Sequence, residues 1–358
     1  IYDVDFERIA DTPGLVAFAG GTRAHDMQVR LKYAGIDAAI ISNIEQAIGA
    51  VADEEAGDTF YAVANYTAFP PLVKELDGLK GATADAVAGR AVARADGSAL
   101  PVGIAPVELS RPLRIVYLYP DALNLYGDGG NVRILEQRLR WRGIPVEVRR
   151  IQHGEAVDFS QVDLVFMGGG PDREQKLASE QLLAMRDELV AYVEGDGPLL
   201  AICGGYQILG RQWLWGDELV PGLGLIDMET RRPGTSADRL IDNMVLESPL
   251  AAHPVVGYEN HAGRTYLGEG VEGFGRVVSS CGHGNNDDDR VEGARYKNVV
   301  GTYSHGPLLS KNPEVADWLL ARALERRAGR TGTPAADLAP LDDGAELAAN
   351  ASMVKRLS

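Results

Sequence analysis

The sequence predicts an α/β protein of two domains: a small α/β domain followed by a larger domain built on a doubly wound, mostly parallel sheet. Its 358 residues exceed the length of one average domain. In the second half, apolar strand patterns that end in turns or glycines alternate with helical patterns, as in RIVYLYP, VDLVFMGGG and PLLAICGG. In a sheet of this kind, functional sites lie beyond the carboxyl ends of the strands.

The stretch 94–112, RADGSALPVGIAPVELSRP, contains three prolines and no helical period, and therefore predicts a linker. We place the first domain at 1–108 and the second at 109–328. In the first domain, the apolar runs Leu15–Ala19 and Ala38–Ile41 flank an amphipathic stretch, Ala24–Ala34, which predicts a small α/β unit. In the second, a helix is predicted over Val132–Arg142. Residues 329–358 are rich in Ala, Asp, Gly and Pro, which predicts a flexible tail.

The composition is that of a soluble globular protein, with 45% apolar and 24% charged residues and no apolar run that predicts a transmembrane segment. A formal net charge of −16 argues against nucleic acid as a partner. Two cysteines are too few for a disulfide framework, which favours the reducing cytoplasm. Because the chain starts at Ile1 rather than Met, we expect it to be processed or part of something longer.

Cys203 directly follows an apolar strand and precedes two glycines and a helical run, which predicts a nucleophile elbow. A side chain on so sharp a turn is exposed above the sheet, and the helix N-terminus behind it stabilises a thiolate. The alternative is a buried structural cysteine beside a glycine turn. A second strand ends in Gly168, Gly169 and Gly170, whose N–H groups, with that of Gly204, could hold an oxyanion. Glycine triplets are also common as simple turns.

His305 follows a short β-branched strand and precedes a glycine and a proline, so it is held at a strand end. A thiolate that attacks an amide needs such a group to protonate the departing ammonia. His261, in GYENHAGRTY, is similarly placed. The other histidines lie in helix-surface or loop contexts, where a solvated side chain is the expected role: His25, His153, His253 and His283.

Together these motifs resemble class I glutamine amidotransferases of the cobyric acid synthase type. More narrowly, the blocks LYPDALNLYGDGGN, GGGPDREQ, GYENHAGRTY and YSHGPLLSKNP look like the amidotransferase subunit of lipid II isoglutaminyl synthase. The resemblance implies that Cys203 is the nucleophile and His305 the base. It also implies that Arg239 holds the carboxylate of glutamine, although an exposed surface arginine is the plain alternative. The further predicted substrate-binding residues are Gly169, Gly170, Gly204 and Gln207.

Ordinary members of the class orient their histidine with a glutamate two residues later, but this chain has Pro307 there. The block GTRAHDMQVRLKYAGI at 21–36, with ANYTAF at 64–69, resembles the C-terminal domain of the Mur-ligase-like partner subunit of the same synthase. That resemblance implies that Asp26 completes a Cys-His-Asp triad. The alternative is a surface ion pair between Asp26 and Arg30, four residues apart on a helix.

The resemblance implies a glutaminase that supplies ammonia for ATP-dependent amidation of the D-glutamate α-carboxyl of the lipid II stem peptide to D-isoglutamine. Such work would place the protein in the cytoplasm, at the inner face of the membrane through lipid II. The ligase half is incomplete, because no GKS or GKT phosphate loop and no cysteine cluster is found. We therefore expect no cofactor in this chain and assign ATP, Mg and Zn to the missing synthetase domains.

Two alternatives remain open at this stage. A cobyric acid synthase-like enzyme would share the catalytic pair but should lack the 21–36 block, and a degenerate amidotransferase would bind glutamine or a partner subunit without catalysis. Cys281, His283 and Asp287–Asp289 could bind a metal, although an acidic loop is the expected role and we predict no metal site.

Overall fold

The computed structural model describes residues 4–51, 61–64, 68–80, 107–215, 218–232 and 238–358. The chain divides into two compact units, one reaching residue 100 and the other starting at residue 101, close to the predicted boundary. Most of the predicted linker at 94–112, and part of the ANYTAF block, lie outside the described residues.

The first unit contains the predicted strand–helix–strand arrangement. Strands β1 (Ala17–Gly20) and β2 (Ala38–Ile41) are parallel, and helix α2 (Ala24–Lys32) connects them. Buried Leu31, Ala34, Ile36 and Ala38 form its core, against which Phe6 and Met27 pack. The remaining described helices are α1 (Glu7–Ala10), α3 (Ile44–Val51) and α4 (Phe69–Gly78).

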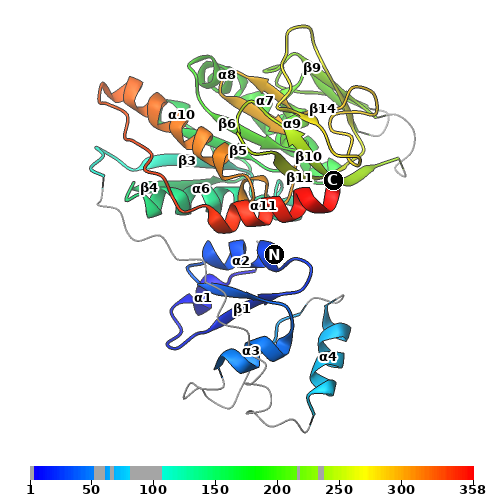
Figure 1. The fold of residues 1–358 in the computed structure, drawn as a ribbon. Helices are drawn as coiled ribbons and strands as arrows, with labels where there is room; N and C mark the ends of the chain where they lie inside the picture. The colour runs from blue at the N-terminus through cyan, green and yellow to red at the C-terminus, as the bar shows by residue number, and fades with distance from the viewer. Residues whose placement is uncertain (1–3, 52–60, 65–67, 81–106, 216–217, 233–237) are drawn as a thin grey trace. The chain divides into compact units, whose positions relative to one another are not determined.

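The second unit is built on a six-stranded sheet in the order β15-β16-β6-β5-β3-β4. Strands β6, β5, β3 and β4 of this sheet are labelled in Figure 1. The strands are β3 (Leu113–Leu118), β4 (Val146–Ile151), β5 (Leu164–Met167), β6 (Leu199–Ile202), β15 (Ala294–Tyr296) and β16 (Val299–Thr302). All neighbours are parallel except β15 and β16. The sheet is therefore mostly parallel, as predicted, and the carboxyl ends of β16, β6, β5 and β3 meet at one edge.

Helices cover this sheet because its central strands are apolar on both faces, and β5, β6 and β16 are buried at every residue. Helix α10 packs against α6, β3 and β5, while α9 packs against β6 and β16 and is contacted by α7. The helices are α6 (Gly130–Trp141), α7 (Asp172–Ala184), α8 (Arg186–Glu194), α9 (Gly204–Leu209), α10 (Pro313–Thr331) and α11 (Gly344–Leu357). Helix α6 thus begins two residues before the predicted Val132.

Two four-stranded sheets complete the unit, in the orders β11-β10-β13-β14 and β12-β9-β7-β8. Their strands are β7 (Gln212–Trp215), β8 (Glu218–Pro221), β9 (Met228–Arg231), β10 (Leu240–Glu247), β11 (Val255–His261), β12 (Arg264–Leu267), β13 (Gly275–Val277) and β14 (Val291–Glu292). Short 3-10 turns occupy η1 (Leu125–Gly127), η2 (Phe159–Gln161) and η3 (Leu308–Ser310). Among the residues described, no helix has the length and apolarity needed to cross a membrane.

The prediction of a flexible tail at 329–358 is wrong. Helix α10 continues to Thr331, and α11 packs on β10 and β11, where Met353 joins Val245 and Val256 in a hydrophobic cluster. The segment before α11 is held by buried Arg138, which binds the carboxylates of Asp317 and Asp343 at 2.8 and 2.6 Å. These contacts order a segment whose composition alone suggested disorder.

Candidate active site

Cys203 occupies the predicted elbow between β6 and α9. Its backbone has φ 50° and ψ −104°, a conformation that non-glycine residues rarely adopt and that sharp functional turns impose. The turn is tightly packed, since a Cβ on Gly205 would lie 2.8 Å from the carbonyl oxygen of Gly168. The side chain of Cys203 lines a pocket at the carboxyl edge of the sheet.

His305 lies three residues beyond β16, and its backbone exchanges hydrogen bonds with Tyr258 at 2.8 and 3.3 Å. It lies beside Cys203, as predicted. A Cβ added to Gly169 would meet the Cβ of Cys203 at 2.9 Å and Cε1 of His305 at 3.3 Å. Only a glycine at this position leaves room for the two side chains to approach each other.

Asp128 supplies the carboxylate that faces His305. Its Oδ1 lies 2.9 Å from Nδ1 of His305, and its Oδ2 accepts a hydrogen bond of 2.9 Å from the Gly169 amide. Both the imidazole and the carboxylate are fully buried. A carboxylate at Nδ1 fixes the proton there and leaves Nε2 directed to chemistry. Nothing in the sequence pattern singled out Asp128, although it lies in the LYPDALNLYGDGGN block.

The electrostatic setting favours a protonated His305. Burial acts against the imidazolium, but the charge and hydrogen bond of Asp128, together with Cys203, outweigh it and raise the pKa of His305 to about 10. An imidazolium beside a sulfur is the pair required for a thiolate nucleophile and for a proton donor to a leaving amine.

Asp26 lies in the first unit, where its carboxylate binds Arg23 at 2.7 and 3.0 Å. Arg30, the partner considered from the sequence, binds Glu7 at 2.9 Å. The role of Asp26 in the triad stays a prediction.

The oxyanion prediction is wrong for one of the glycines. The Gly169 amide donates to Asp128, so it is not directed to a reacting carbonyl. Gly170 lines the pocket, and a Cβ on Gly204 would lie 3.3 Å from the Gly170 nitrogen. The Gly170 nitrogen therefore lies close to Gly204, the residue that follows Cys203.

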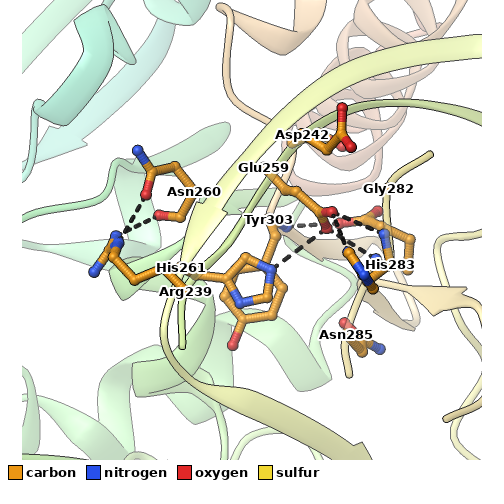
Figure 2. Close-up of polar contacts among 12 residues, drawn as sticks. Arg239, Asp242, Glu259, Asn260, His261, Gly282, His283, Asn285 and Tyr303 are labelled. Carbon is orange, nitrogen blue, oxygen red and sulfur yellow. Dashed lines mark hydrogen bonds and ion pairs between the residues drawn. The ribbon is translucent and has the colours of Figure 1, made fainter. Parts of the chain in front are cut away.

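The pocket beside Cys203 has a volume of about 90 Å³ and is walled by residues of α7, α9, β9 and the β11–β12 turn. Arg239 lines it and donates to the side-chain oxygen of Asn260 and to its carbonyl, each at 2.8 Å (Figure 2). Asn260 in turn donates to the Tyr126 hydroxyl at 2.6 Å, and the Tyr126 ring packs edge-on against His305. Arg239 is thus linked to His305 through the side chains of Asn260 and Tyr126.

Gln207, the other predicted substrate-binding residue, lines the same pocket. Its amide donates to the Tyr303 hydroxyl at 3.0 Å and accepts from Gln175 at 2.9 Å. The ring of His261 stacks on that of Tyr303, with centroids 3.5 Å apart (Figure 2). His261, the alternative base in the sequence, therefore lines the pocket itself, with the ring of Tyr303 stacked against it.

The residues around Cys281 are bound to separate partners. The Cys281 thiol donates to the Asn243 carbonyl, His283 Nδ1 lies 3.1 Å from Glu259, and Asp287 accepts from Arg264 at 2.7 Å. Within the described part of the chain, no group of three or more His, Cys, Asp or Glu side chains could hold a metal ion.

Residues 114–313 match the model of the CobB/CobQ-like glutamine amidotransferase domain, and residues 1–69 match that of the MurT ligase C-terminal domain. The subunit GatD of lipid II isoglutaminyl synthase (glutamine-hydrolyzing) from Staphylococcus aureus is 41% identical over 245 residues, 68% of this chain and 96% of that one. The subunit of the same name from Streptococcus pneumoniae is 35% identical, over 61% of this chain and 83% of that one. Cobyric acid synthase from Listeria innocua is 30% identical over 45% of this chain, but over only 31% of that enzyme.

Proposed function

Because the chain belongs to the CobB/CobQ-like glutamine amidotransferase family, we propose that it hydrolyses glutamine with Cys203 as nucleophile, His305 as proton donor and acceptor, and Asp128 as the group that orients His305. The observation that carries the proposal is the close approach of these three side chains: Asp128 lies 2.9 Å from His305, and His305 and Cys203 both lie against Gly169. Of the three, Cys203 lines a pocket that Arg239 also lines.

The reaction begins when the Cys203 thiolate attacks the side-chain amide carbon of glutamine. The amides of Gly170 and Gly204 stabilise the oxyanion of the tetrahedral intermediate. His305 gives its proton to the departing ammonia, and the freed imidazole then takes a proton from water, which hydrolyses the glutamyl thioester to glutamate. Asp128 holds the imidazole in register and stabilises its charged form throughout.

Arg239 binds the α-carboxylate of glutamine in this proposal. Within the part of the chain that the structure describes, three arginines line the pocket, and two of them carry acidic partners: Arg231 binds Glu229, and Arg232 binds Asp172. The contacts described for Arg239 are with the neutral oxygens of Asn260. Its charge is therefore suited to a substrate carboxylate, which a guanidinium binds in two-point fashion.

We further propose that the released ammonia serves amidation of the lipid II stem peptide. This rests on the names of the two GatD relatives and on the match of residues 1–69 to the MurT ligase C-terminal domain. The chain spans nearly the whole length of the Staphylococcus aureus relative but less than a third of cobyric acid synthase, which favours the lipid II acceptor over a corrinoid. Glutamine hydrolysis and ammonia delivery would then occur in the cytoplasm, with ATP activation carried out on further synthetase domains.

Asp26 remains a second candidate for the acid of the triad. A carboxylate from the partner-like unit could act only by taking the place of Asp128 at Nδ1 or by stabilising the imidazolium from elsewhere. Comparing Asp26→Asn with Asp128→Asn separates the two assignments.

A glutaminase assay with a mechanism-based probe tests the proposal. The wild-type chain should release ammonia and glutamate in equal amounts, and a diazoketone analogue of glutamine should label Cys203 alone. Cys203→Ala should abolish both, while Cys281→Ala serves as the matched thiol control and should change neither. Ammonia release that persists in Cys203→Ala would disprove the mechanism.

A further inference from the structure

The charge balance of the glutamine pocket points to a second recognition residue. Glutamine enters as a zwitterion, so a pocket that selects it needs acceptors for the α-ammonium as well as a positive group for the α-carboxylate, and a carboxylate is the strongest acceptor for an ammonium. Among the described residues that line the pocket, three are arginines, and Asp172 is the one carboxylate.

Asp172 lines the pocket close to Gly170, whose amide is proposed to stabilise the oxyanion. It follows Gly170 and Pro171, which line the same pocket, and it is the first residue of α7. Arg232 donates to its Oδ2 at 2.8 Å, which fixes the carboxylate and leaves Oδ1 as an acceptor for a cation. Gln175, one turn further along α7, also lines the pocket.

Stability alone is a weak reason for this ion pair. The side chain of Asp172 is 47% exposed and that of Arg232 is 20% exposed, and pairs so open to water contribute little to folding. An aspartate in the first turn of a helix also complements the helix dipole, but Glu174 is present in the same turn and does this equally well. Neither effect requires the carboxylate to line a pocket.

We propose that Asp172 binds the α-ammonium group of glutamine and that Arg232 positions it for this contact. The inference rests on the proposed glutaminase function and adds a specificity determinant to it. With Arg239 at the α-carboxylate and Asp172 at the α-ammonium, the pocket distinguishes a free amino acid from a peptide-bound glutamine, whose α-nitrogen carries no charge.

The test pairs a variant with a substrate that lacks the amine. Glutaramate keeps the amide and the carboxylate of glutamine but has no α-ammonium. Asp172→Asn should lower kcat/KM for glutamine by about 10- to 100-fold, mainly through KM, because a hydrogen bond to a charged group is lost. The same variant should leave kcat/KM for glutaramate within about twofold of wild type. Glu174→Gln, on the same helical turn, is the control and should change neither.

Equal loss on both substrates would overturn the proposal, because it would show a general structural role for Asp172. Unchanged hydrolysis of glutamine would overturn it as well. Direct binding keeps the question separate from catalysis: in a Cys203→Ala background, Asp172→Asn should weaken glutamine binding in calorimetry but leave glutaramate binding unchanged. If that pattern holds while the wild type fails to release ammonia, the proposed function is wrong and the assignment of Asp172 stands.

Discussion

Replacing Asp128 with asparagine removes a negative charge from the buried side of His305 while keeping an oxygen that can accept from the Gly169 amide. In the wild type, burial lowers the pKa of His305, but Asp128 is the largest of the causes that raise it, and the result is a pKa of about 10. Holding the pKa of an imidazolium so far above its ordinary value of about 6.5 corresponds to a favourable interaction on the order of a few kcal/mol. Most of that interaction should disappear in Asp128→Asn.

The consequence for the reaction is a shortage of imidazolium at the working pH. The wild-type alkaline limit of activity should lie near pH 10, whereas that of Asp128→Asn should lie at a lower pH, because burial still acts against the imidazolium and the charge of Asp128 no longer offsets it. At pH 8 the variant should lose about 10²- to 10⁴-fold in kcat, since both proton donation and the orientation of the ring are affected. The free energy of unfolding also decreases at high pH, because the folded chain holds the proton of His305 more tightly than the unfolded chain does. The stabilising contribution of His305 is complete below about pH 6.5 and is lost as the pH rises through about 10.

Ammonia release measured from pH 6 to 10 gives the profile, and the rate of Cys203 alkylation by iodoacetamide in a Cys281→Ser background reports the thiolate independently. Asp121→Asn is the control, because Asp121 is an exposed acid in the same segment and should behave as wild type. A wild-type profile for Asp128→Asn would refute the reasoning. Loss of activity in Asp26→Asn with Asp128→Asn unaffected would assign the triad acid to the partner-like unit.

Three further outcomes follow from the packing. Gly169→Ala should reduce kcat by at least about 10-fold, because the new Cβ would lie 2.9 Å from the Cβ of Cys203, while the circular dichroism spectrum stays that of wild type. Gly329→Ala is the control and should leave kcat unchanged, because nothing lies within 4 Å of a Cβ at that position. Burial raises the pKa of Glu292 from 4.5 to about 8, so between these values the folded chain retains a proton that the unfolded chain releases. The wild type therefore loses stability as the pH rises from about 5 to 8, and Glu292→Gln does not. The Tm of Glu292→Gln should exceed that of wild type by an amount that grows over this range. Met353→Ala should lower the free energy of unfolding by about 2 kcal/mol in urea titrations, a loss that a flexible tail could not produce.

The sheet and the pair Cys203–His305 could be predicted because each depends on a short local pattern. An apolar run that ends in glycine marks a buried parallel strand and its turn, and strands β5, β6 and β16 follow this rule. Once the strands are parallel, residues just after them must gather at one edge, whatever the spacing in the chain. The prediction for the tail is wrong because it rests on amino-acid composition and not on the helical spacing of apolar residues. Ala349 and Met353 are four residues apart on one buried face of a helix.

Asp128 could not be found in this way, because it follows its strand β3 by ten residues and reaches His305 only through the irregular η1 turn. Tyr126 in that turn has φ 57°, a conformation that no apolar or polar period encodes. The turn delivers two side chains to the histidine, the Asp128 carboxylate at Nδ1 and the Tyr126 ring against its edge. Tyr126 is also bonded to Asn260, which holds Arg239. The groups proposed to bind the substrate carboxylate and to transfer the proton, Arg239 and His305, are therefore both linked to one loop, and a change in that loop should alter KM and kcat together.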